Sequence, residues 1–251
     1  MLKVVPNESA LIHTEGDQAT LLVSDLHLGL EKDLASKGFR IPPYSQKMLD
    51  RINSLAEKNH LNRVIVVGDV KHSIGKVEDV DWGIIPWFFD TLLDIFHSVE
   101  IVPGNHDGGI RFVLPNRVKL YPAEGMVIGK RQKVGVTHGH SWPSKEVIAS
   151  RNIVMGHSHF RYEMRDKFGG RSKEAVWLFA AYDVADMLEK AELPAVKQGE
   201  GKLIVMPPFN NLVGGQAINA KGGFDFGPIL SSRSFRLTDA DIFLLDGTRV
   251  G

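Results

Sequence analysis

Residues that could bind metal ions follow several short apolar runs of the chain. The polar residues that end five of these runs are Asp25 and His27, Asp69, Asn105, His106 and Asp107, His138 and His140, and His157 and His159. Six of the ten histidines stand in these motifs, so they are not scattered as surface histidines would be. A single Asp-X-His pair is a weak signal, whereas five such motifs, each at the end of an apolar run, indicate one site.

Oxygen and imidazole donors set the chemistry that this group of residues could perform. The chain has no cysteine, so no thiolate is available as a ligand. Such a donor set favours Mn²⁺, Fe²⁺, Zn²⁺ or Ni²⁺ over Cu⁺ or an iron–sulfur cluster, and we expect two divalent ions, with manganese first. Two ions bridged by one carboxylate can lower the pKa of a shared water and hold the oxygens of a displacement at phosphorus. Phosphoester hydrolysis is the reaction that fits.

The spacing of apolar residues predicts the strands and helices that must position these residues. Short β-branched runs predict buried strands at 21–23, 64–67, 99–102, 134–136 and 153–155. Apolar residues on one face predict covering helices over 45–58 and 85–96, which together with the strands indicate an α/β fold. Ligands at the carboxyl ends of strands in one open sheet could meet at one point. Further strands at 176–180, 203–206 and 242–245 predict a second sheet, formed by 160–251, within a single domain 1–251.

The order of the motifs resembles the calcineurin-like metallophosphoesterase superfamily over residues 20–160. The resemblance implies a four-layer sandwich of two mixed β-sheets flanked by helices. It also implies one ion on Asp25, His27, Asp69 and His159, and a second on Asp69, Asn105, His138 and His157. By the same resemblance, His106 stabilises the transition state or protonates the leaving oxygen, and Asp107 orients its ring.

A narrower resemblance extends to nearly the whole chain. Ser24-Asp25-Leu26-His27-Leu28-Gly29, Met206-Pro207-Pro208-Phe209-Asn210, Gly214-Gly215 and Leu245-Asp246-Gly247 look like the ICC-like phosphoesterases related to SbcD-type repair nucleases. This group implies a phosphodiesterase that acts on nucleic acid, with association to a DNA helicase or ligase in some bacterial relatives. One position departs from the superfamily, because His72 stands where many members have a second Asp.

Two other functions stay open. A small-molecule hydrolase of the same fold, such as one that cleaves a nucleotide pyrophosphate, also opens with Ser-Asp-Leu-His-Leu and suits the net charge of zero. A non-catalytic metal-binding or docking module should have lost a ligand, and none is missing.

Three residues beside the motifs are candidates for substrate contacts. His140, Arg111 and Arg161 could hold phosphate oxygens, although each is also consistent with a turn or rim residue. The longest apolar stretch, 84–96, is too short and too interrupted to span a bilayer, and the first residues lack the apolar core of a signal peptide. We therefore expect a cytoplasmic protein without a membrane segment.

Overall fold

The computed structural model describes residues 1–194, 199–220, 227–232, 234–235 and 237–250. Its first sheet has the order β1-β2-β3-β4-β5-β6. These strands are β1 (Leu2–Val4), β2 (Ala10–Glu15), β3 (Gln18–Ser24), β4 (Arg63–Val67), β5 (Ser98–Val102) and β6 (Lys119–Leu120). The sheet is mixed, since β1, β2 and β3 pair antiparallel and β3 to β6 pair parallel.

The second sheet has the order β10-β11-β12-β9-β8-β7, and β13 also pairs with β11. Its strands are β7 (Met126–Ile128), β8 (Val134–Val136), β9 (Asn152–Met155), β10 (Arg161–Arg165), β11 (Arg171–Asp183), β12 (Glu200–Val205) and β13 (Asp241–Leu244). This sheet is also mixed, because β12, β9 and β8 run parallel whereas the other pairs are antiparallel.

The division of strands between the sheets corrects one expectation. All the strands expected from the sequence form, but β8 and β9 belong to the second sheet and not to the sheet of β3, β4 and β5. The second sheet therefore begins before residue 160, with β7. Apolar periodicity identifies a buried strand but carries no information about its pairing partner, which here is β12, about fifty residues further along.

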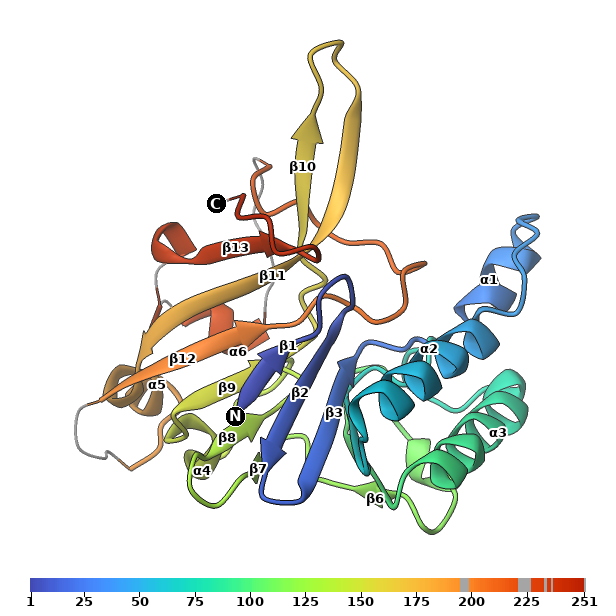
Figure 1. The fold of residues 1–251 in the computed structure, drawn as a ribbon, viewed down its shortest axis with the longest axis horizontal. Coiled ribbons are helices and arrows are strands. Elements are labelled where there is room, and N and C mark those ends of the chain that lie inside the picture. Colours follow the sequence, from blue (N-terminus) through green and yellow to red (C-terminus); the bar gives the residue numbers. More distant parts are fainter. Residues whose placement is uncertain (195–198, 221–226, 233, 236, 251) are drawn as a thin grey trace.

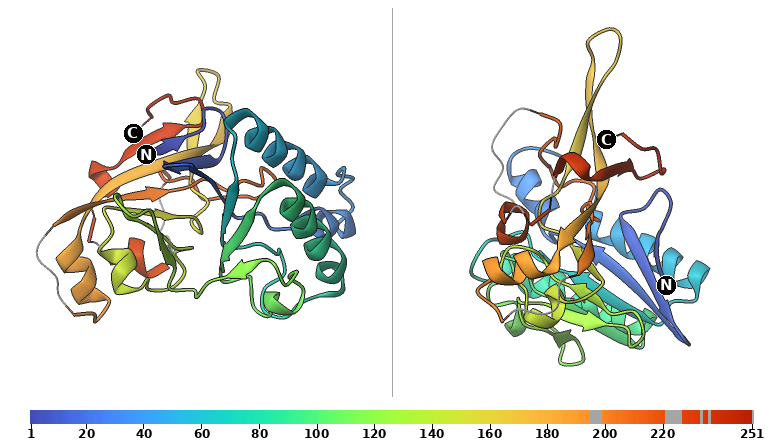
Figure 2. Two further views of the ribbon diagram at one scale, coloured as in Figure 1. Left: turned by 60° about the horizontal axis from the view of Figure 1, so that its bottom comes forward. Right: turned by 90° about the vertical axis from the view of Figure 1, so that its left-hand side faces the viewer.

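Helices cover the outer faces of both sheets (Figure 1). The helices are α1 (Leu30–Ser36), α2 (Tyr44–Asn59), α3 (Asp79–Ile95), α4 (Lys145–Ile148), α5 (Val184–Lys190) and α6 (Gly227–Ser231), with 3₁₀ turns η1 (Ile110–Phe112) and η2 (Leu237–Asp239). Figure 2 shows α2 and α3 on one side and α4 and α5 on the other, with the sheets between them. The α3 helix begins earlier than expected, because Glu78 and Asp81 form a capping box at its start. No helix in the described part of the chain is long and apolar enough to cross a bilayer.

Alternate residues of the central strands pack into different layers. On β4, Val64 and Val66 join the cluster beneath α2 and α3, whereas Ile65 and Val67 join the cluster between the sheets. All five residues of β4 are buried, as expected for a strand covered on both faces. A polar side chain within such a strand needs a buried partner, as Arg63 of β4 has in Glu100 of β5, and the candidate site lies beyond the ends of the strands.

Candidate metal centre

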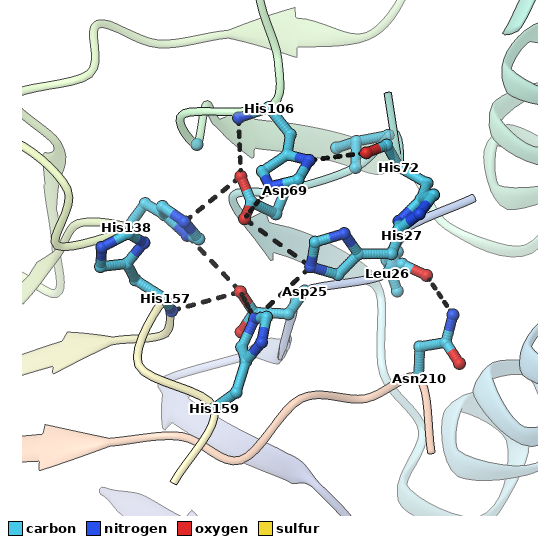
Figure 3. Close-up of polar contacts among 12 residues, drawn as sticks. Asp25, Leu26, His27, Asp69, His72, His106, His138, His157, His159 and Asn210 are labelled. Carbon is cyan, nitrogen blue, oxygen red and sulfur yellow. Dashed lines mark hydrogen bonds and ion pairs between the residues drawn. The ribbon is translucent and has the colours of Figure 1, made fainter. Parts of the chain in front are cut away.

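Four strand ends, two from each sheet, meet at one edge of the sandwich. Asp25 and His27 follow β3, and Asp69 follows β4, both in the first sheet. His138 follows β8, while His157 and His159 follow β9, both in the second sheet. Figure 3 shows these six side chains pointing toward a common centre. The two-sheet arrangement thus brings the ligands together from opposite sides, and not along one sheet edge.

The six side chains form two overlapping clusters. Asp25, His27, Asp69 and His159 offer ligand atoms that all lie within 4.8 Å of one another, and Asp69, His138 and His157 do the same. Asp69 belongs to both clusters: its Oδ2 lies 3.7 Å from His27 Nε2 and its Oδ1 lies 3.3 Å from His138 Nε2. One carboxylate shared between two ligand sets is the arrangement that a bridged pair of ions requires.

The spacing of the donors agrees with metal coordination. The Nε2 atoms of His27 and His159 are 3.4 Å apart, and two imidazole nitrogens bound tetrahedrally to one zinc-like ion would lie about 3.4 Å apart. Asp25 Oδ2 is buried and makes no hydrogen bond. A buried polar atom without a partner is rare and needs an explanation. Divalent ions supply one, so the residues present fit the metals that the donor chemistry implies.

The backbone of these ligands is unusually strained. Asp25, His27, Asp69, His157 and His159 all have positive φ values, between 43° and 70°. They make up five of the eight non-glycine residues with positive φ in the described part of the chain. Each such residue costs roughly 1 to 2 kcal/mol relative to an ordinary conformation. Strain concentrated at one cluster marks a functional site, because the surrounding fold must hold it in place.

Charges within the cluster favour the protonation states that metal binding needs. Burial lowers the pKa of His27 to about 3 and that of His157 to about 4, so both rings are neutral at neutral pH. Burial alone would raise the pKa of Asp25, but the neighbouring His159 holds it below its ordinary value. His138 acts in the same way on the pKa of Asp69. Both carboxylates are therefore ionised.

His138 differs from the other ligands. Burial opposes its charge, but Asp69 and Asp25 raise its pKa to about 9. Its Nδ1 lies 3.0 Å from the Val67 carbonyl oxygen, which can only accept, so Nδ1 carries a proton. Nε2 is then the atom that faces Asp69, and an ion bound there must replace a second proton.

The ring of His106 is oriented by a backbone carbonyl. Its Nδ1 lies 2.7 Å from the carbonyl oxygen of His72 (Figure 3), while its Nε2 lies 3.8 Å from Asp69 Oδ2. Because the carbonyl can only accept, the Nδ1 atom holds the proton and Nε2 faces the ligand cluster. This contact could not be predicted from residue types, since a carbonyl oxygen is present at every residue.

Asp107 has different hydrogen-bond partners from the one expected, the ring of His106. Its Oδ1 accepts from the backbone N–H groups of Val70, at 2.9 Å, and Lys71, at 3.3 Å, and its Oδ2 accepts from Gly104 at 2.7 Å. Asp107 therefore joins the loop after β4 to the loop after β5. It is the His72 carbonyl, and not Asp107, that orients His106. Burial and the nearby Asp69 raise the pKa of Asp107 to about 7.

A buried lysine fixes the loop that carries His72. The Lys71 side chain is fully buried, and its Nζ donates to the carbonyl oxygens of Ser73, Gly75 and Lys76 at 2.6, 3.2 and 3.3 Å. The Ser73 hydroxyl in turn donates to Asp81 at the start of α3. The role of Lys71 depends on contacts that appear only in the folded chain, so its residue type alone does not indicate it.

The segment after β12 supports the turn of Asp25 and His27. The buried Asn210 donates from Nδ2 to the Leu26 carbonyl oxygen at 2.8 Å (Figure 3), and the Phe209 N–H donates to Ser24 at 2.8 Å. This contact spans 184 residues of sequence. The Pro-Pro-Phe-Asn motif is therefore more than a surface turn, because its hydrogen bonds stabilise the strained turn that carries Asp25 and His27.

The remaining expected site residues lie in different places. His140 is half-buried, with its ring centroid 5.4 Å from that of His138 and 6.2 Å from that of His157. Asn105 is exposed on the loop between Gly104 and His106, and Arg111 is exposed on η1. Arg161 uses its guanidinium within the protein, where it donates to the carbonyl oxygens of Val213 and Lys173. The structure thus places His140 at the cluster and directs Arg161 elsewhere.

A cavity of about 570 Å³ adjoins the cluster. His72 and His106 form one side of it, and the lining also includes Lys32 and Ser36 of α1 and Ser73. Asp33, at the same wall, lies 3.7 Å from His72 Nε2 through its Oδ2. A molecule in this cavity would touch the exposed side of His106, so the cavity offers room for a group attached to the reacting atom.

Comparison with known proteins places this geometry in a family. Residues 19–196 match the family described as calcineurin-like phosphoesterase. The Pseudomonas putida nuclease MPE has a similar structure, with a TM-score of 0.52 and 14% identity over 100% of both chains. The phosphoesterase YfcE of E. coli covers 59% of this chain and 73% of its own, with 17% identity and a TM-score of 0.38.

Two further comparisons concern a third solved structure and the curated proteins. Wild-type Vps29 of Entamoeba histolytica, complexed with zinc, has 16% identity and a TM-score of 0.34, covering 92% of this chain and 95% of its own. No curated protein matches the sequence. At these identities the structural neighbours show the fold alone. The family match covers most of the chain, so the protein belongs to the calcineurin-like phosphoesterase family and is a metal-dependent hydrolase.

Proposed function

We propose that the protein is a two-metal phosphodiesterase that hydrolyses nucleic-acid phosphodiesters. The observation that carries the proposal is the position of Asp69, whose two carboxylate oxygens face two different ligand clusters. Bridged ion pairs are suited to displacement at phosphorus, where the attacking and leaving oxygens both need stabilisation.

The proposal assigns ligands residue by residue. Asp25, His27, Asp69 and His159 would hold one ion, and Asp69, Asn105, His138 and His157 the other. Oxygen and imidazole ligands without thiolate suit manganese, with iron, zinc or nickel as alternatives. The bound ions would polarise the phosphoryl group and lower the pKa of the attacking water.

His106 is placed to donate a proton to the leaving oxygen. Its Nδ1 proton is held by the His72 carbonyl, so Nε2 is the ring atom that would exchange a proton with a substrate, and it can donate one only when both ring nitrogens are protonated. That atom points toward the shared carboxylate of Asp69 and borders the cavity that would hold the leaving group. A general acid in this position matters most when the leaving group is a poor one, such as a sugar alkoxide.

The cavity beside His106 does not favour one substrate, because Lys32 and the hydroxyl groups of Ser36 and Ser73 lie in it beside the carboxylates of Asp33, Glu78 and Asp81. A nucleic-acid substrate is supported by the resemblance of the sequence to the ICC-like, SbcD-related group. Against this stands the net charge of zero, which favours a small-molecule phosphoester or nucleotide pyrophosphate as the alternative substrate.

Hydrolysis of a panel of substrates distinguishes a nucleic-acid substrate from a small-molecule phosphoester or nucleotide pyrophosphate. Metal-stripped protein is reloaded with Mn²⁺ or Zn²⁺ and given an aryl phosphodiester, an aryl phosphomonoester, a nucleoside diphosphate ester, single-stranded DNA and double-stranded DNA. We expect hydrolysis of the aryl diester and of DNA, loss of both with Asp69→Ala, and wild-type rates with Asp94→Ala, an exposed aspartate on α3. Cleavage of the nucleoside diphosphate ester without any DNA cleavage would favour the small-molecule alternative.

A further inference from the structure

An arm formed by β10 and the first part of β11 projects from the body of the protein (Figure 1). The two strands pair antiparallel from Arg161 opposite Ala175 to Arg165 opposite Arg171. The turn at the tip is ordered by Asp166, whose Oδ1 accepts from Phe168 N at 2.7 Å and Gly170 N at 2.9 Å. The arm is therefore a defined ribbon that extends one edge of the second sheet beyond the body of the protein.

The charges of the arm are divided between its two faces. Directly opposed residues in an antiparallel pair share a face, and faces alternate along each strand. One face, here called the basic face, carries Arg161, Glu163, Arg165, Arg171 and Lys173. The other face carries Tyr162, Met164, Ser172 and Glu174, without a cation. A protein of zero net charge thus gathers three exposed cations, those of Arg165, Arg171 and Lys173, against one carboxylate on one side of a narrow ribbon, while the Arg161 guanidinium bonds to backbone carbonyls at its base.

The basic face contains a repulsive pair that folding does not need. Arg165 and Arg171 stand directly opposite each other, and like charges in that arrangement are destabilising. Both contact the single carboxylate of Glu163, at 2.9 and 3.7 Å, and their side chains are 63% and 61% exposed. One carboxylate cannot neutralise two guanidinium groups, so the pair retains positive charge that an external anion could balance.

The tip adds an exposed aromatic ring. Phe168 is 86% exposed, and Lys167 Nζ lies 5.1 Å from the centre of its ring. A ring in water next to a cation can stack on a nucleic-acid base while the cation contacts a phosphate. The tip could therefore bind the same nucleic-acid strand as the basic face.

The base of the arm is fixed relative to the metal centre. The arm begins two residues after His159, and Arg161 at its base donates to the Val213 and Lys173 carbonyl oxygens. Asn219 holds the strand further along, because it accepts from Glu163 N and donates to Glu163 O. Six residues of chain separate His159 from Arg165, which is at most about 20 Å in extended form. A DNA strand crosses that distance in about six nucleotides.

We propose that the basic face of the arm binds the phosphate backbone of the nucleic-acid strand that is cleaved at the metal centre. This inference rests on the proposed nuclease function and adds the surface that holds the strand. An aryl diester has no neighbouring nucleotides that could contact Arg165 and Arg171, so the arm should matter for nucleic-acid strands and not for such a small substrate.

The test compares two double variants with the same loss of charge. Arg165→Gln with Arg171→Gln removes the exposed cations of the basic face, and Lys47→Gln with Lys58→Gln removes two exposed cations of α2. Binding of 20-nucleotide single-stranded DNA is measured against salt concentration, together with cleavage of that DNA and of an aryl diester.

We expect the arm variant to bind the DNA about tenfold more weakly at low salt, with a salt slope reduced by about 1 to 2. Its rate on the aryl diester should match the wild type, which also shows that it folds. The α2 variant should behave as the wild type throughout.

Three results have distinct meanings. Equal DNA binding and salt slopes for both variants, with DNA cleaved by the wild type, would overturn the arm proposal and leave the nuclease function standing. Absence of DNA cleavage by the wild type would overturn the nuclease function itself. A change from dimer to monomer in the arm variant, seen by sedimentation, would show that the arm contacts a second copy of the chain and would also overturn the proposal.

Discussion

Gly156 lies against the carboxylate of Asp25, so one added methyl group there tests how tightly the centre is built. A Cβ at this position would lie 2.6 Å from Asp25 Oδ2 and 2.9 Å from Ser24 Cβ. Ordinary Cβ contacts begin at 3.4 Å, so the Asp25 carboxylate would have to move by about 0.8 Å. It cannot turn away freely, since its Oδ1 accepts from His157 N at 3.2 Å and lies 3.0 Å from His159 Nε2.

The size of the effect follows from this displacement. Overpacking of this kind destabilises a fold by about 1 to 3 kcal/mol, and a misplacement near 1 Å at a reacting centre costs about 10²-fold in rate. For Gly156→Ala we therefore expect a loss of about 2 kcal/mol in stability and a fall of roughly 10- to 100-fold in kcat/KM. The ion bound by the Asp25 cluster should be held more weakly than the other.

The matched control is Gly83→Ala on α3, where an added Cβ meets nothing within 4 Å. A glycine-to-alanine change inside a helix should stabilise by about 0.5 to 1 kcal/mol and leave the rate unchanged. The assays are denaturant unfolding of the metal-free protein, elemental analysis and hydrolysis of an aryl diester. The reasoning would be refuted if Gly156→Ala kept both ions at wild-type affinity together with an unchanged kcat/KM.

Three further outcomes follow from the site. His106→Ala should keep both ions and lose about 10²- to 10⁴-fold in DNA cleavage but much less in aryl diester hydrolysis, because an aryl oxide leaves unaided; equal losses on both substrates would exclude proton donation. The pKa of His138 is raised from 6.5 to about 9, so the metal-free protein should lose about 3 kcal/mol of stability as the pH rises from 6.5 through 9, as followed by urea unfolding. A flat profile there would contradict the His138–Asp69 interaction. Finally, His159→Gly should be about 1 kcal/mol more stable than His159→Ala in metal-free protein, because φ at this position is +44°; an alanine variant of equal stability would show that the backbone there is unstrained.

The sequence predicted candidate ligands that the structure brings together, because each of them follows a buried strand. Pairing could not be predicted in the same way, and β8 and β9 joined the sheet of β12. The α/β class, both covering helices and the strand positions are confirmed, while the single-domain assignment stays a prediction.

The residues that orient the ligands were beyond the reach of the sequence. Lys71 and Asn210 act through backbone carbonyls, which leave no trace in residue type, and Asn210 lies 184 residues from its partner. Arg161 follows a ligand in sequence, but its guanidinium bonds to carbonyl oxygens at the base of the arm. Position next to a motif therefore predicted neither the partner of Arg161 nor that of Asp107.

Metal stoichiometry tests the central claim most directly. Metal-stripped protein is titrated with Mn²⁺, and bound ions are counted per chain for the wild type, Asp69→Ala and the exposed-site control Asp94→Ala. Since Asp69 is the one side chain common to both clusters, we predict two ions for the wild type and for Asp94→Ala, and none for Asp69→Ala. One ion in the wild type, or two retained by Asp69→Ala, would contradict the bridged two-metal centre.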